Sequence, residues 1–424
     1  MVDENVRIGV HDVVVSAQKA ALFLRKTSTF NKNNALHAIA DFLLDGADKI
    51  VQANARDMEV GRSKGMKESL LDRLYLDVSR ISDIADAVRH VASLADPVGE
   101  VVEGRRLENG MRLENIRVPM GVIGMIYEAR PNVTVDAATL ALKAGSAAVL
   151  RGGSAAIETN KVLLSLMRAA LESVDFPANC ITSVDEWGRE GGVALMQERG
   201  YVDLVIPRGG SGLIQEVVRS SLVPVIETGV GNCHVYIDSS ANLDDALNIA
   251  INSKTHRLGV CNAAETILVH GDVASACVPQ LVHELQNKDI HVHACKKSIA
   301  LCQPHTLLSD ATEEDWETEY LGPHVALKIV DTEDEAIKHI SRYSTGHTEA
   351  IVARDAEHIQ NFIDSVDSAA VIVNASTRFT DGGQFGLGAE IGISTQKLHA
   401  RGPMGLKEIT STKWIVTGDG HVRA

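Results

Sequence analysis

Short apolar runs alternate with longer amphipathic segments along most of this chain. In the first hundred residues, apolar side chains recur at helical spacing, as at Leu36, Ile39 and Leu43, so this region is predicted to be mostly helical. From residue 121 onward, short apolar runs predict strands that helical segments separate. The strands are expected at 121–126, 147–150, 181–184, 202–206 and 223–226, with helices near 135–144, 155–174, 190–199 and 211–221. Strands that alternate with helices pair in parallel, which predicts a doubly wound α/β domain.

The same alternation restarts after Gly229 and predicts a second parallel-sheet domain of α/β class. Its strands are expected at 233–237, 264–269, 325–330, 349–353 and 369–373, and its helices near 242–256, 272–287, 333–343 and 355–365.

Two extended segments lack helices of their own to pack against. The polar stretch 101–118 carries the turn signal Glu108-Asn109-Gly110, which predicts a projecting hairpin, and 409–422 predicts an extended tail. Unpaired strands invite pairing with another chain, so the hairpin and the tail are expected to complete a sheet in a partner subunit of a homo-oligomer. The predicted organisation is a first domain at 1–99 and 120–228, a second at 229–404, and an oligomerisation element at 100–119 with 405–424.

Composition agrees with two domains and narrows the class of partner. A chain of 424 residues exceeds the roughly 250 to 300 residues at which single domains stop growing. Its 41 basic and 56 acidic residues give a net charge of −15, which argues against nucleic acid and anionic membranes as partners. No stretch approaches the ~18 uninterrupted apolar residues of a membrane span, and the 6 cysteines show no CxxC spacing. We therefore expect a cytoplasmic protein with free thiols.

Two glycine-rich turns follow predicted strands and open predicted helices. One is Arg151-Gly152-Gly153-Ser154, and the other is Arg208-Gly209-Gly210-Ser211. Glycine lets the backbone approach a ligand, the first N–H groups of a helix attract phosphate, and arginine grips phosphate through two donors. Each turn alone is more often an ordinary strand-to-helix connection. Two of them at the carboxyl edge of one parallel sheet favour a dinucleotide site, so the first domain is the predicted dinucleotide-binding domain.

Cys261 lies between a predicted helix and a predicted strand, where a thiol can reach solvent and nearby N–H groups can favour its thiolate. Most cysteines so placed are inert, so its significance depends on the surrounding motifs. His291, His293 and Cys295 alternate along a predicted strand and have side chains that bind zinc. A solvated polar edge is the better interpretation of these three residues, and no metal is expected.

Recognisable motifs run along almost the whole chain. They are VPMGVIG at 118–124, YEARPN at 127–132, ETGVGNCH at 227–234, RLGVCNA at 257–263, AIKHI at 336–340, STGHTE at 344–349, NASTRF at 374–379 and LHARGP at 398–403. In this order the earlier motifs resemble the aldehyde dehydrogenase superfamily. Those from 336 onward narrow the resemblance to its γ-glutamyl phosphate reductase family.

The resemblance implies an aldehyde dehydrogenase-like fold, in which the second domain is catalytic and bears Cys261, and the hairpin and tail join subunits. It also implies NADPH-dependent reduction of L-glutamyl 5-phosphate to L-glutamate 5-semialdehyde and phosphate, in proline biosynthesis, through a thioester on Cys261. A contact with the glutamate kinase that supplies the acyl phosphate is a further expectation.

The resemblance also implies roles for individual residues. Glu319 matches the glutamate that contacts the nicotinamide ribose, and either Asn132 or Arg130 stands where the superfamily has its oxyanion asparagine. Glu227 matches the glutamate that activates water in hydrolytic members, a role that a reductase must suppress.

Arginines are the expected ligands of the anionic groups. Arg151 and Arg208 are candidates for the 2′-phosphate of NADPH. Arg130, Arg378 and Arg401 are expected to bind the substrate, whose carboxylate and phosphate need bidentate donors in an acidic protein.

Three alternatives stay open at this point. A hydrolytic aldehyde dehydrogenase would release an acid without phosphate. A reductase of a related acyl phosphate, such as an acetylated glutamyl or an aspartyl phosphate, would differ only in substrate. A catalytically silent nucleotide-binding protein would leave Cys261 unreactive, and the presence of Cys261, both glycine turns and Glu319 argues against it.

Overall fold

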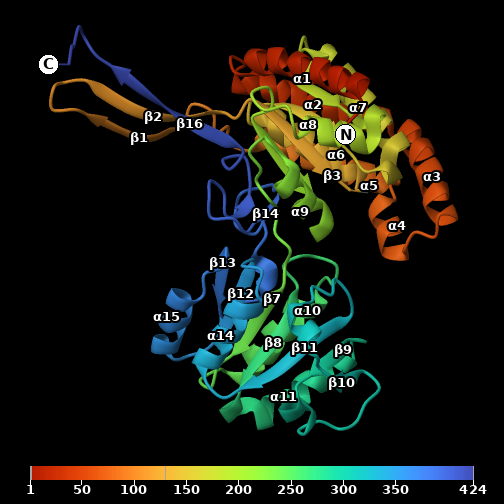
Figure 1. Ribbon diagram of the computed structural model, residues 1–424, viewed down its shortest axis with the longest axis vertical. Helices are drawn as coiled ribbons and strands as arrows, with labels where there is room; N and C mark the ends of the chain where they lie inside the picture. Colours follow the sequence, from red (N-terminus) through yellow and green to blue (C-terminus); the bar gives the residue numbers. More distant parts are fainter. Residues whose placement is uncertain (1, 129, 424) are drawn as a thin grey trace. The chain divides into compact units, whose positions relative to one another are not determined.

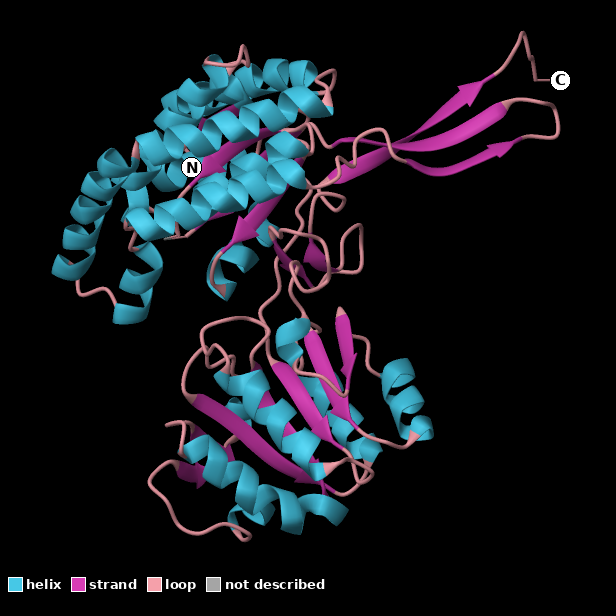
Figure 2. Cartoon of the chain, turned by 180° about the vertical axis from the view of Figure 1, so that it is seen from behind, coloured by secondary structure: helices cyan, strands magenta, loops and turns pink. Residues whose placement is uncertain are grey.

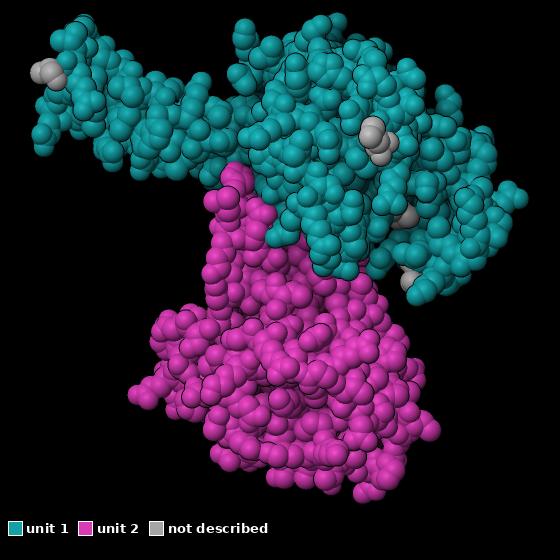
Figure 3. All heavy atoms as spheres, viewed as in Figure 1, with its two compact units in different colours: residues 1–227, 387–392, 404–424 teal, residues 228–386, 393–403 magenta. Residues whose placement is uncertain are grey.

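Figure 1 traces the chain through the computed structural model, which describes residues 2–128 and 130–423. Met1, Ala424 and Ala129 of the YEARPN motif lie outside the described residues. The chain divides into two compact units, coloured separately in Figure 3. Unit 1 is Met1–Glu227 with Leu387–Gly392 and Met404–Ala424, and unit 2 is Thr228–Gly386 with Ile393–Pro403. The segment 387–392, expected in the second domain, therefore belongs to the first unit.

Unit 1 begins with helices whose apolar positions face inward. They are α1 Glu4–Leu24, α2 Thr29–Asp45, α3 Ala47–Ser63, α4 Glu68–Leu74 and α5 Val78–Ser93. On α5, the buried residues Ile81, Ala85 and Val88 recur at helical spacing. The side chains of Ser28 and Asp77 accept from first-turn amides of α2 and α5, which fixes where these helices start.

A parallel sheet in the order β5-β4-β3-β6 forms the centre of unit 1. Figure 2 shows its strands in magenta among the cyan helices of this unit. Its strands are β3 Val122–Tyr127, β4 Ala147–Arg151, β5 Ile181–Ser183 and β6 Leu204–Arg208, and its helices are α6 Pro131–Lys143, α7 Ile157–Glu172, α8 Gly188–Leu195 and α9 Ser211–Ser220. The chain advances from β3 through β4 to β5 and then reverses to reach β6. Right-handed crossovers therefore place α6 and α7 on one face and α8 on the other, as in a doubly wound fold.

The strand expected at 223–226 does not form. Val225 makes only an isolated bridge with Val205. Pro224 has no N–H to donate, so it cannot extend a ladder of strand hydrogen bonds.

The hairpin and the tail form one antiparallel sheet within the chain. Its strands are β1 Val101–Arg106, β2 Arg112–Pro119 and β16 Thr410–Thr417, in the order β1-β2-β16 (Figure 1). Thr410 pairs with Pro119 and Thr417 with Arg112. The tail is therefore paired within the chain, because β2 supplies an edge along its full length. That this sheet completes one in a partner subunit stays a prediction. All residues of the edge strand β1 are exposed.

Unit 2 is built on a parallel sheet in the order β10-β9-β11-β8-β7-β12-β13. Its strands are β7 Cys233–Ile237, β8 Ala264–His270, β9 His291–Ala294, β10 Leu308–Asp310, β11 His324–Val330, β12 Thr348–Val352 and β13 Ala370–Val373. Its helices are α10 Leu243–Thr255, α11 Gly271–Gln286, α12 Lys296–Ile299, α13 Glu313–Glu317, α14 Glu333–Tyr343 and α15 Ala356–Ser365.

The sheet of unit 2 separates two apolar cores. One core packs residues of α10 and α11, such as Leu247 and Leu281, against the sheet. The other packs residues of α14 and α15, such as Ile340 and Phe362. Helices on both faces make this a second doubly wound sheet.

Two short strands, β14 Gly392–Ser394 and β15 Gly402–Met404, pair where the chain changes unit. In the described part of the chain, no helix is long and apolar enough to cross a membrane.

Candidate active site

The candidate residues of unit 2 gather at the amino-terminal edge of its sheet. Gly231 precedes β7, Cys261 precedes β8 and Glu319 precedes β11. Because β11, β8 and β7 are neighbours and parallel, their amino ends share one edge. This is the opposite edge from the one at which parallel α/β sheets usually bind ligands.

The Cys261 loop is fixed by contacts on both sides. A Cβ built on Gly231 would lie 1.5 Å from the carbonyl oxygen of Cys261, so no side chain fits between the two backbones. The buried Cys233 thiol donates to the same oxygen, with 3.1 Å from Sγ to O. On the other side, Thr377 Oγ1 donates to the carbonyl oxygen of Asn262 at 2.7 Å. Cys261 itself is partly exposed, so the loop holds a reachable thiol in place.

A positive charge lies within electrostatic reach of Cys261. Burial lowers the pKa of the Arg378 guanidinium, and the charges of Asp381 and Cys261 oppose that shift. Arg378 Nε donates to His256 Nδ1, 3.3 Å away, at the start of the Cys261 loop. A cation beside a thiol favours the thiolate, which is the form that attacks.

Glu319 is joined to the Cys261 loop through Gly231, whose N–H donates to Glu319 Oε1 at 2.7 Å. Behind the Glu319 turn, Lys254 and Glu265 form an ion pair whose side chains have no exposed surface. Burial lowers the pKa of Lys254 and raises that of Glu265 to about 7, and each charge opposes the shift of the other. The sequence analysis missed this pair, and its only signal was Glu265, a charged residue inside the predicted strand 264–269.

Arg401 has a different environment. Its Nη1 donates to Asp367 Oδ1 and its Nη2 to Asp367 O, both at 2.8 Å. Asp367 also pairs with Lys397, and both ion pairs lie at the surface. Substrate binding by Arg401 stays a prediction, as does any role of Glu227, the last residue of unit 1 before the chain enters unit 2.

In unit 1, the two glycine-rich turns flank the same strand. Arg151 pairs with Ile126, and Arg208 pairs with Tyr127. The parallel sheet therefore brings the turns Arg151–Ser154 and Arg208–Ser211 to one carboxyl edge, where the sequence pattern places them.

In each of these turns, a carboxylate accepts a hydrogen bond from a glycine N–H. Asp185 Oδ1 accepts from the Gly152 N–H at 2.6 Å, and Glu128 Oε2 accepts from the Gly210 N–H at 2.9 Å. The sequence analysis missed both, because each carboxylate comes from another segment of the chain. The available signal was that Glu128 follows β3 and Asp185 follows β5, so both end at the same sheet edge.

The start of α9 is the candidate phosphate site of unit 1. Its N-cap residue is Gly210, no side chain caps the helix, and a Cβ on Gly212 would meet no atom within 4 Å. A helix start without a side-chain cap can bind phosphate through its first amides. Here the Glu128 carboxylate accepts from the Gly210 N–H next to it. Arg151 has its Nε donating to Gly188 O at 3.3 Å.

Asn132 and Arg130 lie at the start of α6, where Arg130 is the N-cap residue. Asn132 Nδ2 donates to Asp136 Oδ2 at 3.1 Å. Burial raises the pKa of Asp136 to about 6, and the hydrogen bond from Asn132 opposes that shift. Both candidates for the oxyanion donor belong to unit 1, and the choice between them stays a prediction.

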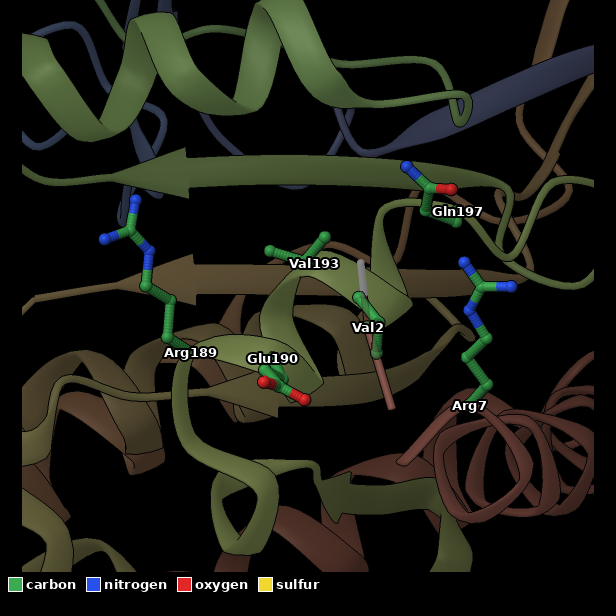
Figure 4. A pocket seen from close by; sticks show the side chains of 6 residues that line it. All are labelled: Val2, Arg7, Arg189, Glu190, Val193 and Gln197. Carbon is green, nitrogen blue, oxygen red and sulfur yellow. The ribbon is translucent and has the colours of Figure 1, made fainter. Parts of the chain in front are cut away.

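Other concave or ligand-like features lie apart from these residues. A hollow of about 480 Å³ in unit 1 is lined by Val2, Arg7, Arg189, Glu190, Val193 and Gln197, and Figure 4 shows its two arginines on either side of the valines. In unit 2, the rings of His291, His293 and His324 lie against one another, with ring centroids 4.6 to 5.5 Å apart. Within residues 2–128 and 130–423, no group of three or more ligating side chains is arranged to hold a metal ion.

The family comparison agrees with this architecture. The model of the aldehyde dehydrogenase family matches residues 4–299 and 293–415. The solved structure of γ-glutamyl phosphate reductase from Thermotoga maritima aligns with a TM-score of 0.95 at 46% identity, covering 98% of this chain and 100% of that one. Two doubly wound sheets, one with glycine turns and one with a cysteine loop, thus form an aldehyde dehydrogenase fold.

Curated relatives narrow the class. The γ-glutamyl phosphate reductase of Kineococcus radiotolerans is 55% identical over 408 residues, which are 96% of this chain and 94% of that protein. The one from Thermobifida fusca is 53% identical over 414 residues, which are 98% of each chain. The chain belongs to the γ-glutamyl phosphate reductase family.

The contact between Gly231 and Cys261 gives a direct prediction. Gly231→Ala must push the Cys261 carbonyl away, because the new Cβ has no room. We expect the rate of Cys261 alkylation by iodoacetamide to change at least about fivefold, with a loss of about 1–3 kcal/mol in stability. The control is Gly212→Ala, where a Cβ meets open space. Peptide mapping over time measures the rate, and equal rates in both variants would contradict the account.

Proposed function

We propose that this chain reduces L-glutamyl 5-phosphate to L-glutamate 5-semialdehyde and phosphate, a step of proline biosynthesis, with NADPH as the hydride donor. The observation that carries the proposal is a partly exposed Cys261, on a fixed loop within reach of the Arg378 charge. The reaction itself comes from relatives that bear the reductase name and match nearly the whole chain.

The proposed first step is attack of the Cys261 thiolate on the γ-carbonyl of the acyl phosphate. Arg378 favours the thiolate and is suited to bind an anionic group of the substrate. Backbone N–H groups near Cys261, with Asn132 or Arg130, are the proposed donors to the oxyanion. Collapse of the tetrahedral intermediate releases phosphate and leaves a thioester on Cys261.

A bound nicotinamide dinucleotide would supply hydride to the thioester carbonyl. Cys261 then leaves the resulting thiohemiacetal as a thiolate, which releases the aldehyde and restores the nucleophile. A thioester suits this chemistry, since its carbonyl is less stabilised by resonance than that of an ester. Glu227 has the position of a water-activating base in hydrolytic relatives, and the proposed reaction requires that water be kept from the thioester.

The proposed dinucleotide site is the carboxyl edge of the unit 1 sheet. Gly209, Gly210 and Ser211 at the start of α9 would hold phosphate through backbone N–H groups, with Arg208 beside them. The Gly210 N–H, which donates to Glu128 Oε2, would exchange that acceptor for a phosphate oxygen. Gly152, Gly153 and Ser154 form the second turn, and Arg151 is the proposed ligand of the 2′-phosphate. Glu319 in unit 2 is the proposed acceptor for the nicotinamide ribose.

We also propose that the enzyme is a cytoplasmic homo-oligomer. The exposed edge strand β1 offers unpaired backbone groups to another subunit, which supports this assignment. Contact with the kinase that makes the labile acyl phosphate remains part of the proposal.

Replacement of the nucleophile tests the function. Cys261→Ser should fold and bind cofactor normally but lose kcat by about a thousandfold or more, since almost no serine alkoxide exists at neutral pH. Steady-state oxidation of glutamate 5-semialdehyde with NADP measures this. The wild-type rate should also rise with inorganic phosphate. Cys302→Ser, another partly exposed cysteine, is the control. Phosphate-independent oxidation would place the enzyme with the hydrolytic aldehyde dehydrogenases.

Cofactor preference is tested at Arg151. Loss of a guanidinium that binds a 2′-phosphate through two hydrogen bonds costs about 1.5 to 3 kcal/mol. Arg151→Ala should therefore raise the KM for NADPH about 10- to 100-fold and change the KM for NADH little. Arg219→Ala, in the last turn of α9, is the matched control. Equal losses with both cofactors would remove Arg151 from the 2′-phosphate site.

A further inference from the structure

The buried ion pair Lys254–Glu265 connects the two ends of the Cys261 loop. Lys254 lies in the last turn of α10 and Glu265 near the start of β8, so the pair joins the two ends of the segment that carries Cys261. Neither side chain has exposed surface. Burying two charges costs free energy that their attraction often fails to recover, so stability alone is a weak reason for such a pair.

The same carboxylate holds a second segment of the site. Glu265 Oε1 accepts from the Leu321 N–H at 3.2 Å, on the turn that carries Glu319. Leu321 has a φ of 49°, a left-handed conformation that a non-glycine residue keeps only when its surroundings enforce it. The hydrogen bond from its N–H is one such constraint.

The neighbouring residue Tyr320 is also held in place, by ring stacking and a hydrogen bond. Its ring stacks on His293 and His324, with centroids 5.3 and 5.6 Å away, and its hydroxyl donates to Asp315 Oδ1 at 2.8 Å. Lys254 Nζ lies 5.8 Å from the centre of the Tyr320 ring. The turn therefore has little freedom to move away from the ion pair.

These contacts link Glu265, Glu319 and Cys261 in one closed set. Glu265 accepts from the Leu321 N–H, and Leu321 lies on the same turn as Glu319. Glu319 accepts the Gly231 N–H, and Gly231 abuts the Cys261 carbonyl. The Cys261 loop leads directly into β8, near whose start Glu265 lies, which closes the set of contacts. A shift at Glu265 must therefore move both Glu319 and Cys261.

We propose that Lys254 and Glu265 are positioning residues, which fix Glu319 and Cys261 relative to each other for the reduction. This inference rests on the proposed function for the chemistry of the site. Neither residue reaches solvent, so neither is assigned a contact with substrate or cofactor.

The test separates positioning from folding by replacing the pair in two ways. Lys254→Met/Glu265→Leu fills the site with apolar groups, a change that often leaves stability unaltered, but it removes the acceptor for the Leu321 N–H. Lys254→Met/Glu265→Gln also removes both charges yet keeps an amide oxygen that can accept from Leu321. The control is the exposed pair of unit 2, as Lys297→Met/Asp331→Asn.

We expect the Leu variant to melt within a few degrees of wild type and to lose about 10- to 100-fold in kcat/KM, as small misplacements of reacting groups do. Its dissociation constant for NADP, measured by fluorescence titration without substrate, should rise about 3- to 10-fold. The Gln variant should recover most of both losses. In a Glu319→Ala background, which removes the acceptor of the Gly231 N–H, the Leu variant should add little further loss, since both changes break the same set of contacts.

Each other outcome decides against the proposal. A folded Leu variant with wild-type kcat/KM and NADP affinity overturns it, and so does a Gln variant as impaired as the Leu variant. If neither variant folds, the pair serves folding and the positioning role is rejected. An inactive wild-type enzyme would instead refute the proposed function, whereas the NADP titration would still compare the variants.

Discussion

The backbone contact between Gly231 and Cys261 is the constraint on which the rest of the unit 2 site depends. Since no Cβ fits between the two backbones, the loop before β7 and the loop before β8 behave as one piece. Cys233 and Thr377 then tie this piece to the strands and loops around it. The proposed nucleophile, held in this way, would lose little freedom when it attacks, which is how fixed geometry lowers a reaction barrier.

The candidate residues lie at opposite edges of the two sheets, and the helix ends at each edge set its electrostatic potential. At the carboxyl edge of unit 1, helices begin, and the amides at the start of α9 attract anions. At the amino edge of unit 2, α10 ends at the Cys261 loop, and the carboxyl end of a helix disfavours a thiolate. The charge of Arg378, which interacts with Cys261, opposes this effect.

Patterns with local causes could be predicted from the sequence. The alternation of strands and helices, both glycine turns and their common sheet edge followed from hydrophobic periodicity and parallel pairing. Interactions between distant segments could not be predicted in this way. Asp185 and Glu128 close turns that lie elsewhere in the chain, and Glu265 meets Leu321 across 56 residues.

One error and one omission in the sequence analysis have simple physical reasons. The run 223–226 is apolar enough for a strand, but Pro224 removes the donor that a ladder needs. The tail strand had no predicted partner, although the hairpin that precedes β3 offered a free edge in the same chain. Pairing of segments so far apart depends on the folded topology, which periodicity does not encode.

The central claim is that Cys261 carries the acyl group and that phosphate, not water, releases it. The most direct test incubates the enzyme with glutamate 5-semialdehyde and NADP in phosphate-free buffer, then maps the modified peptides by mass spectrometry. The account predicts a glutamyl thioester on the peptide that contains Cys261, which disappears when phosphate is added. Absence of the adduct, or its loss at the same rate without phosphate, would contradict the account.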